Sequence, residues 1–251
     1  MQSIRSVLVP TLLGAMLWGG LSGCASAPER GGMLHSKADP LEAWNRNVFT
    51  FNEGLDKVAL KPAAKAYVHT VPPLVRQGVS NFFGNFADVW SSVNNFLQVK
   101  PARGFSDLMR VGTNTVFGLG GIFDVATQAG IERTREDFGQ TLGVWGLPAG
   151  PYIVWPILGP SSLRDSFGLP LDMAAGAPAA FKDDGLRLGA SLLQVVNVRA
   201  NLLSAGQLLD DVALDRYAFV RDAYLQRRYS LLYDGDPPDQ PSEEDLEESP
   251  Q

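Results

Sequence analysis

The sequence predicts a mainly helical protein; two of its segments support that prediction, and a third is an exception to it. Residues 81–99 place large apolar side chains at three- and four-residue steps, the spacing of one face of an α-helix. Residues 186–232 contain no proline and combine apolar with charged residues, as in helices that have one face in water. Residues 150–162, interrupted by three prolines, favour an apolar loop or a short strand instead.

The N-terminus resembles an export signal. Arg5 is followed by uncharged residues from Ser6 to Ser22 that end in small side chains, which is the pattern of a signal peptide over residues 1–23. A membrane-spanning anchor is the alternative, but the run is short for a bilayer and contains Pro10. Residues 24–38 are small and polar and are expected to form a flexible tether.

Cys24 is the only cysteine of the chain, so it can form neither an internal disulfide nor a zinc cage. The stretch Leu21-Ser22-Gly23-Cys24 resembles the lipobox of bacterial lipoproteins, in which the cysteine receives a diacylglycerol and an N-acyl chain. Two or more acyl chains give stable membrane anchoring. By resemblance to lipoprotein sorting rules, Ala25 in place of an Asp favours the inner leaflet of an outer membrane. No cofactor beyond these chains is expected.

The net charge of −6 belongs to the C-terminal tail, residues 234–251, which is rich in Asp and Glu and lacks Lys and Arg. The remainder is nearly neutral, so no nucleic-acid binding is predicted. Because the tail also has four prolines and few apolar groups, we expect it to be disordered. It is either a solubilising end or a docking arm for a basic partner.

The folded body is expected to begin with a helix at Asp39-Pro40, because the Asp can cap it and Pro suits its first position. The helix should continue to about Leu60, where Lys61-Pro62 ends or kinks it. A second break is predicted at Pro72-Pro73.

The polar side of the 81–99 helix has a single charge, Asp88. Uncharged groups lower the cost of placing a polar face near hydrocarbon, so this face is either close to lipid or an ordinary surface short of Lys and Glu. Its members are Asn81, Asn85, Ser91, Ser92, Asn94, Asn95 and Gln98.

The stretch 111–131 has one charge, Asp124, and its glycines argue against a single spanning helix. Two short helices around Gly118–Gly121 are predicted, at the membrane interface or in the core. Trp145, Tyr152 and Trp155 form either an aromatic interface with the bilayer or a local core. Arg227 and Arg228 either meet anionic headgroups or complement the helix dipole.

No catalytic constellation is recognisable. His35 and His69 are the only histidines, and neither a G-x-S-x-G motif nor a Cys-His cluster occurs. The adjacent acids Glu136-Asp137 and Asp183-Asp184 are of a kind common on protein surfaces. The sequence therefore predicts a protein that is not an enzyme and has no metal site.

Several long segments occur in the order found in the MlaA family, also called VacJ lipoproteins. They are the lipobox, DPLEAWNRNVFTFN, GVSNFFGNF, NTVFGLGGIFDVA, FGQTLGVWGLPAGPYIVWPILGPSSLRDSFG and RYAFVRDAYLQRR. The chain resembles this family over about residues 21–230, and residues 39–233 are expected to be an MlaA-like helical domain.

The resemblance implies a ring-shaped helical lipoprotein with a central amphipathic channel, embedded in the inner leaflet of the outer membrane. Such proteins associate with trimeric porins and pass mislocalised phospholipids from the outer leaflet to a soluble periplasmic carrier, MlaC. This maintains outer-membrane lipid asymmetry without chemistry on the lipid. Candidate channel or lipid-contact residues are Asn45, Phe49, Phe51, Asn52, Asn81, Phe82, Asn85, Gly120, Gly121, Tyr152 and Trp155. The alternatives are a lipoprotein that only braces a porin and a phospholipid-modifying enzyme.

Overall fold

The computed structural model of the protein describes residues 39–238, in which helices predominate, so the predicted mainly helical fold is confirmed. The elements are α3 (Glu42–Leu55), a π-helical turn (Asp56–Leu60), α4 (Lys61–Thr70), α5 (Pro73–Leu97), α6 (Pro101–Val116), α7 (Val125–Gln128), α8 (Phe138–Val144), β1 (Tyr152–Trp155), β2 (Gly159–Ser162), α9 (Leu163–Ala174), a 3₁₀ turn (Ala177–Ala180), α10 (Asp184–Asn201), α11 (Leu203–Val212) and α12 (Arg216–Leu232).

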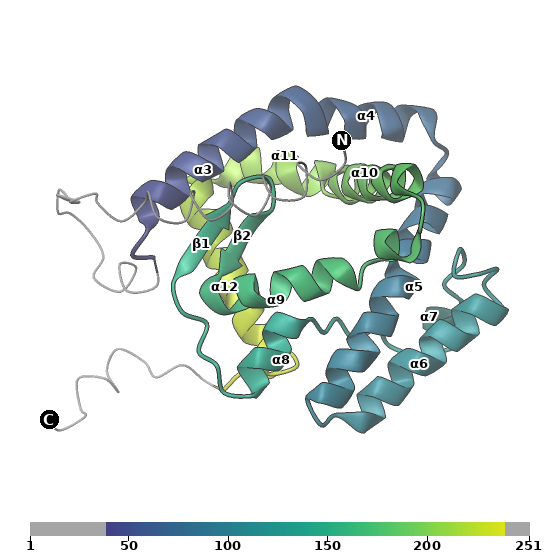
Figure 1. Ribbon diagram of the computed structural model, residues 1–251. Helices are drawn as coiled ribbons and strands as arrows, with labels where there is room; N and C mark the ends of the chain where they lie inside the picture. Colours follow the sequence, from purple (N-terminus) through teal and green to yellow (C-terminus); the bar gives the residue numbers. More distant parts are fainter. Residues whose placement is uncertain (1–38, 239–251) are drawn as a thin grey trace, which may run out of the picture. The chain divides into compact units, whose positions relative to one another are not determined.

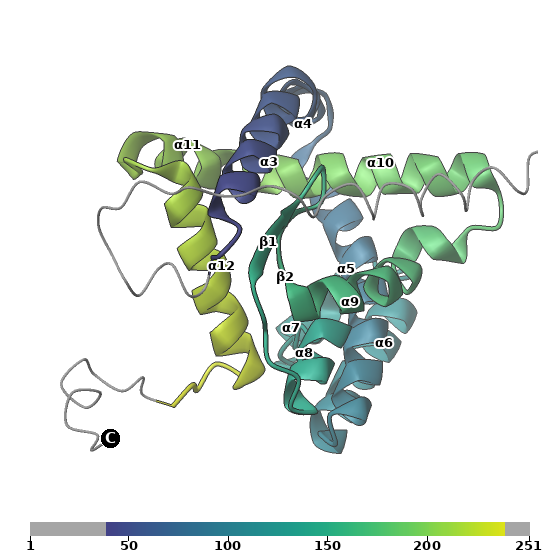
Figure 2. The ribbon, with the colours of Figure 1, turned by 60° about the vertical axis from the view of Figure 1, so that its left-hand side comes forward.

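The elements follow one another around a circuit that the C-terminal helices close. In Figure 1, α3 and α4 run along the top, α5 and α6 form one side, and the β1–β2 hairpin with α12 forms the other. α10 packs against both α4 and α5, and α12 packs against α8 and β2. Figure 2 shows α12 and the hairpin on the same side of the molecule. Segments far apart in sequence therefore meet.

Pro62 does not end the first helix. The chain remains helical from α3 into α4, and the π-helical turn lies directly before Lys61-Pro62. A π-helical turn changes the hydrogen-bond register locally, which accommodates the missing proline N–H. The predicted break at Pro72-Pro73 is confirmed, because α4 ends at Thr70 and α5 begins at Pro73.

The predicted helix cap at Asp39 is wrong. α3 begins at Glu42, its N-cap is Leu41, and no side chain caps it. The Asp39 carboxylate is buried instead, where it accepts hydrogen bonds from Asn45 Nδ2 at 2.8 Å and from the Tyr217 hydroxyl, and it pairs with Arg221. Several hydrogen bonds and an ion pair to a buried carboxylate stabilise the fold more than one exposed helix-capping hydrogen bond does. The tertiary contacts of Asp39 therefore override its local preference for an N-cap.

α5 is amphipathic, as predicted, but its polar side faces inward. Asn85, Asp88, Ser91, Ser92, Asn94, Asn95 and Gln98 are all buried. The expected open surface is wrong for this face, since it packs against α6 and residues 131–141 through side-chain hydrogen bonds, and its contact with lipid stays a prediction. The mutual hydrogen bonding offsets the cost of burying so many polar groups.

The opposite side of α5 and α6 exposes large apolar residues. Val89 is 42% exposed and Val93 40%, while buried hydrophobic residues are few throughout the described chain. A contiguous apolar surface is a common mark of a membrane or protein contact. We call this surface the apolar band. It comprises Val89, Val93, Phe96, Leu97, Phe105, Leu108, Met109, Val116, Phe117, Leu119, Ile122 and Phe123.

The remaining sequence expectations for the body hold in outline. Residues 111–131 contain the end of α6, a turn through Gly118–Gly121 and the short α7, as predicted. The expected short strand is half of an antiparallel hairpin that pairs Tyr152 with Ser162 and Trp155 with Gly159. Residues 186–232 return to helix in α10, α11 and α12.

The signal peptide, Cys24 and the tether lie outside the described residues, as does most of the acidic tail. The first tail residue is part of the fold, since Asp234 pairs with Lys100 at 2.7 Å and also with Arg103. The start of the tail is therefore held to the folded body by ion pairs.

Candidate functional site

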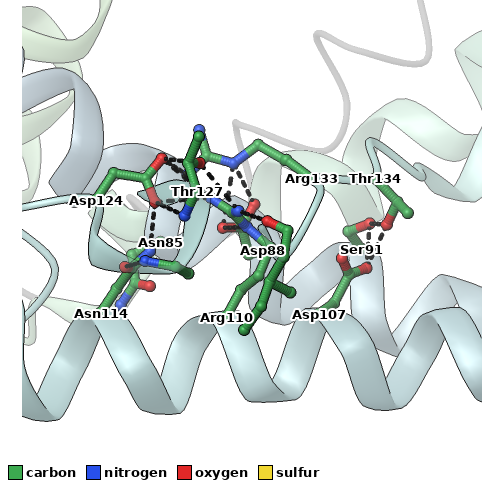
Figure 3. A network of polar contacts seen from close by, with 12 residues as sticks. Asn85, Asp88, Ser91, Asp107, Arg110, Asn114, Asp124, Thr127, Arg133 and Thr134 are labelled. Atoms are coloured by element: carbon green, nitrogen blue, oxygen red, sulfur yellow. Dashed lines mark hydrogen bonds and ion pairs between the residues drawn. The ribbon is translucent and has the colours of Figure 1, made fainter. Parts of the chain in front are cut away.

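A network of polar side chains fixes the geometry around α5, and Arg110 of α6 lies at its centre (Figure 3). Arg110 is fully buried, with Asp88 and Asp124 as its acidic partners. Its other donors bond to the Thr127 hydroxyl and the Ile131 carbonyl. All three guanidinium nitrogens therefore donate within the protein.

The acids of this network are affected differently by their surroundings. Burial raises the pKa of Asp88, although Arg133 and Arg110 oppose the change. Burial also acts to raise the pKa of Asp124, but hydrogen bonds from the Thr127 hydroxyl and backbone N–H, helped by Arg110, outweigh it and hold that pKa at about 2. The charged form of Asp124 is thus well supported.

A cavity of about 710 Å³ lies along the inner side of α5, which we call the polar cavity. The loop before α8, the ends of α9 and α12, and α10 complete its wall. Its polar lining residues are Ser80, Asp88, Arg133, Thr134, Arg135, Glu136, Asp137, Asp172, Gln194, Asn197, Asn201 and Arg227, and they are joined by apolar groups such as Phe83, Trp90 and Leu202.

A second cavity of about 550 Å³, the apolar cavity, adjoins α5 further toward its N-terminus. Every lining residue is apolar or glycine: Leu74, Val75, Gly78, Val79, Phe82, Phe83, Ile122, Phe123, Phe181, Ala190 and Leu193. Phe83 lines both cavities. A cavity with polar walls and one with hydrocarbon walls therefore share Phe83 as a lining residue, a combination that suits an amphipathic ligand.

Two carboxylates on the polar cavity hold neighbouring elements together. Asp172 of α9 accepts hydrogen bonds from the Trp90 indole at 2.7 Å and from the Phe138 backbone N–H at 2.9 Å. Glu136 accepts one from Gln98 at 2.8 Å. Burial raises the pKa of each acid, and these hydrogen bonds partly oppose the change.

Five of the predicted lipid-contact residues lie by the apolar cavity and its rim. Phe82 lines it directly, and Asn81 donates to the carbonyl of Ile122, another lining residue, at 2.9 Å. Asn85 is buried and donates to Thr115. Gly120 and Gly121 adopt left-handed backbone conformations, and Gly121 packs directly against the Asn85 side chain.

The other predicted residues gather at the β1–β2 hairpin. Asn45 is fully buried and bonds to Tyr152 and Val154 backbone atoms, while Asn52 bonds to those of Trp155 and Ile157. Both asparagines thereby hold the hairpin against α3. Tyr152 belongs to a small core with Val48, Val154 and Tyr217, on which Phe49 packs. Phe51 and Trp155 are largely exposed, at 56% and 38%.

Residues of the hairpin, α11 and α12 line a third cavity of about 420 Å³. Phe49 and Asn52 line it, together with Leu202, which also lines the polar cavity. Of the predicted residues, Phe82 thus lines the apolar cavity, and Phe49 and Asn52 line the third one. Which of them contacts lipid stays a prediction.

Sequence reasoning missed most residues of the polar cavity. Arg133 and Arg135 lie in the segment before α8, Asp172 in α9 and Asn197 in α10, and the four share no local motif. Of its wall, the sequence singled out only isolated features, including the Glu136-Asp137 pair and Arg227. A helix whose charges are almost absent, such as α5, was the one signal that a specialised polar environment lay nearby.

Fold and site together define a class: a mainly helical protein with an exposed apolar band and, beside α5, one cavity with a mixed polar lining and one with an apolar lining. None of the helices between residues 39 and 238 has the length and hydropathy needed to cross a bilayer. The same part of the chain contains no group of acids and histidines suited to a metal ion.

Residues 37–231 match the family model of the MlaA lipoprotein, and the chain belongs to this family. It is 37% identical over 222 residues to the intermembrane phospholipid transport system lipoprotein MlaA of Escherichia coli, with 86% of each chain covered. The protein of that name from Haemophilus influenzae is 33% identical, with 90% of this chain and 91% of the relative covered.

A solved structure confirms the fold. It comes from work on the structural basis for maintenance of bacterial outer membrane lipid asymmetry, and it superposes with a TM-score of 0.66 at 36% sequence identity. The match covers 77% of this chain and 98% of the solved one. The mainly helical architecture is therefore that of a known member of the family.

Proposed function

We propose that this protein is an outer-membrane lipoprotein that removes phospholipids from the outer leaflet and passes them to a periplasmic carrier of the MlaC type, so maintaining lipid asymmetry. The observation that carries the proposal is the meeting of the polar and apolar cavities at Phe83. A phospholipid needs a polar wall for its headgroup and an apolar one for its chains, because either part is costly in the other's surroundings.

The apolar band supports a position in the membrane. α5 and α6 turn their polar sides toward each other and their large apolar side chains outward, the reverse of a water-soluble helix pair. Insertion into the inner leaflet would cover this surface, with the acyl chains on Cys24 as the covalent anchor. The same surface is suited to contact with a trimeric porin, the partner that the family resemblance implies.

Transport without chemistry fits the polar cavity. Its acids are bound to neighbouring groups: Asp172 and Glu136 accept hydrogen bonds, and Asp88 and Asp137 pair with arginines. Acids bound in this way hold the elements of the cavity wall in place, which differs from the role of a general acid or base that exchanges a proton with a substrate. The energy for directed transfer would come from partners, since the described cavities contain no phosphate-binding loop.

The proposal is tested with cells that lack this gene and are complemented with the wild type or with Cys24→Ala. Phosphatidylethanolamine at the cell surface is labelled with an amine reagent that does not cross membranes. We expect labelling to rise on deletion and to be reversed by the wild type alone. Unchanged labelling on deletion would contradict transport and favour a porin brace, whereas phospholipid hydrolysis by the purified protein would favour an enzyme.

A further inference from the structure

The charges of the polar cavity are not balanced locally. Its four acids all have partners within the protein: Asp88 pairs with Arg110 and Arg133, Asp137 pairs with Arg228, and Asp172 and Glu136 accept hydrogen bonds from neutral donors. Each of these carboxylates therefore already accepts at least one hydrogen bond or ion pair from the fold.

The three arginines on the same wall differ in this respect. Arg133 is 23% exposed, its Nε lies 2.9 Å from Asp88, and its guanidinium rests against Gly84. Arg135 and Arg227 are exposed, and within residues 39–238 neither has a carboxylate at ion-pair distance. The charged side chains of the cavity wall that lack a partner within residues 39–238 are therefore both arginines.

The two unpaired arginines come from separate parts of the chain. Arg135 lies in the extended segment before α8, and Arg227 lies in the last turns of α12. Its neighbour Arg228 is turned into the fold, where it pairs with Asp137 and Asp165. Adjacent arginines on one helix thus have different roles, since one closes the circuit of helices and the other faces the cavity.

A guanidinium group matches phosphate well, because its planar fork donates two parallel hydrogen bonds and stays charged at every physiological pH. A lipid phosphate held here would share the polar cavity with Phe83, a residue that also lines the apolar cavity in which acyl chains could lie. We infer that Arg135 and Arg227 form a phosphate subsite for the lipid headgroup; this rests on the proposed transport function.

The test compares two lipids with the same acyl chains. Fluorescent phosphatidylglycerol carries the phosphate and fluorescent diacylglycerol lacks it, and each is titrated into full-length lipidated protein in detergent. The double variant Arg135→Ala/Arg227→Ala should bind phosphatidylglycerol about ten- to a hundredfold more weakly, the effect of losing hydrogen bonds to a charged group. Its diacylglycerol affinity should not change.

Two further variants control for folding and charge. Arg187→Ala removes an exposed arginine of α10 that lines none of the three cavities, and it should bind both lipids like the wild type. Arg135→Lys/Arg227→Lys keeps the charges without the planar fork and should recover part of the lost affinity. Helical circular dichroism confirms that each variant is folded.

The outcomes separate this subsite from the function on which it rests. If the wild type binds neither lipid, the transport proposal fails. If the wild type binds phosphatidylglycerol and the double variant binds it equally well, the subsite is overturned while transport stands. Titration with inorganic phosphate tests whether the two arginines bind free phosphate instead of a lipid headgroup. If the double variant loses phosphate binding without any change in lipid affinity, the site is one for free phosphate, and the inference is overturned.

Discussion

Arg110 Nη2 lies 3.0 Å from both carboxylate oxygens of Asp124, which ties the turn after α6 back onto α6 itself. Ile122 and Phe123 in that turn line the apolar cavity. The ion pair therefore supports the rim of the cavity. The Arg110 side chain is fully buried, whereas that of Asp124 is 20% exposed.

Replacing Arg110 by Ala should destabilise the protein by about 3 to 5 kcal/mol, because Asp88 would be left buried with half of its compensation. Arg103→Ala is the control, since this arginine is 43% exposed and its pair with Asp234 is worth about 1 kcal/mol at most. Urea unfolding in detergent measures both free energies. Equal losses for the two variants would contradict a central role for Arg110.

The charge of Asp124 should make stability depend on acid pH. Its pKa is held at about 2 in the fold, below the ordinary 3.8, so its contribution is complete above 3.8 and is lost as the pH falls toward 2. The free energy of unfolding of the wild type and of Asp124→Asn, measured between pH 2 and 5, should converge as the pH falls. A difference that stays constant over this range would show that ionisation of Asp124 is not the cause.

Gly121 and Gly120 provide a matched pair. Both have positive φ angles, so replacement by Ala strains either backbone by about 1 kcal/mol. A Cβ at Gly121 would also lie 2.8 Å from the Asn85 side chain, whereas nothing lies within 4 Å of one at Gly120. Gly121→Ala should therefore lower the thermal midpoint clearly more than Gly120→Ala. The reverse order would show that the turn does not pack on Asn85 as described.

Asn45 and Asn47 test how the hairpin is held. Asn45 is buried and bonds to two backbone groups of β1, so Asn45→Ala should cost about 2 to 3 kcal/mol through unsatisfied partners. Asn47, two residues away on α3, is exposed, and Asn47→Ala should change stability by about 0.5 kcal/mol or less. Hydrogen exchange of the Val154 amide, which donates to Asn45, should speed up only in Asn45→Ala.

The helices were predictable from sequence, but the direction in which α5 faces was not. Periodicity shows that a helix has two faces, and it assigns the apolar one to the interior only where the exterior is water. Here Asn94 and Asn95 are buried and Val93, directly before them, is exposed, because the partners of the two asparagines are polar groups of other elements. The sequence of α5 itself does not indicate which residues of other elements those partners are.

The site was harder to predict than the helices, because its residues lie far apart along the chain. Asp39 was expected to cap a helix, and its decisive partner, Tyr217, comes 178 positions later. The polar cavity likewise combines α5, α9, α10 and α12. The long ordered segments shared with a known family therefore predicted more about function than any local pattern did.

The most direct test of lipid passage is to fill the polar cavity. Ala87 of α5 lines it and is exposed there, so Ala87→Trp should block it, whereas Lys65→Trp on α4 adds the same ring outside all three cavities. Each variant is expressed at wild-type abundance in cells lacking the gene, and surface phosphatidylethanolamine is labelled. We expect Ala87→Trp to label like the deletion and Lys65→Trp like the wild type. Wild-type labelling in Ala87→Trp cells would contradict passage of lipid through this cavity.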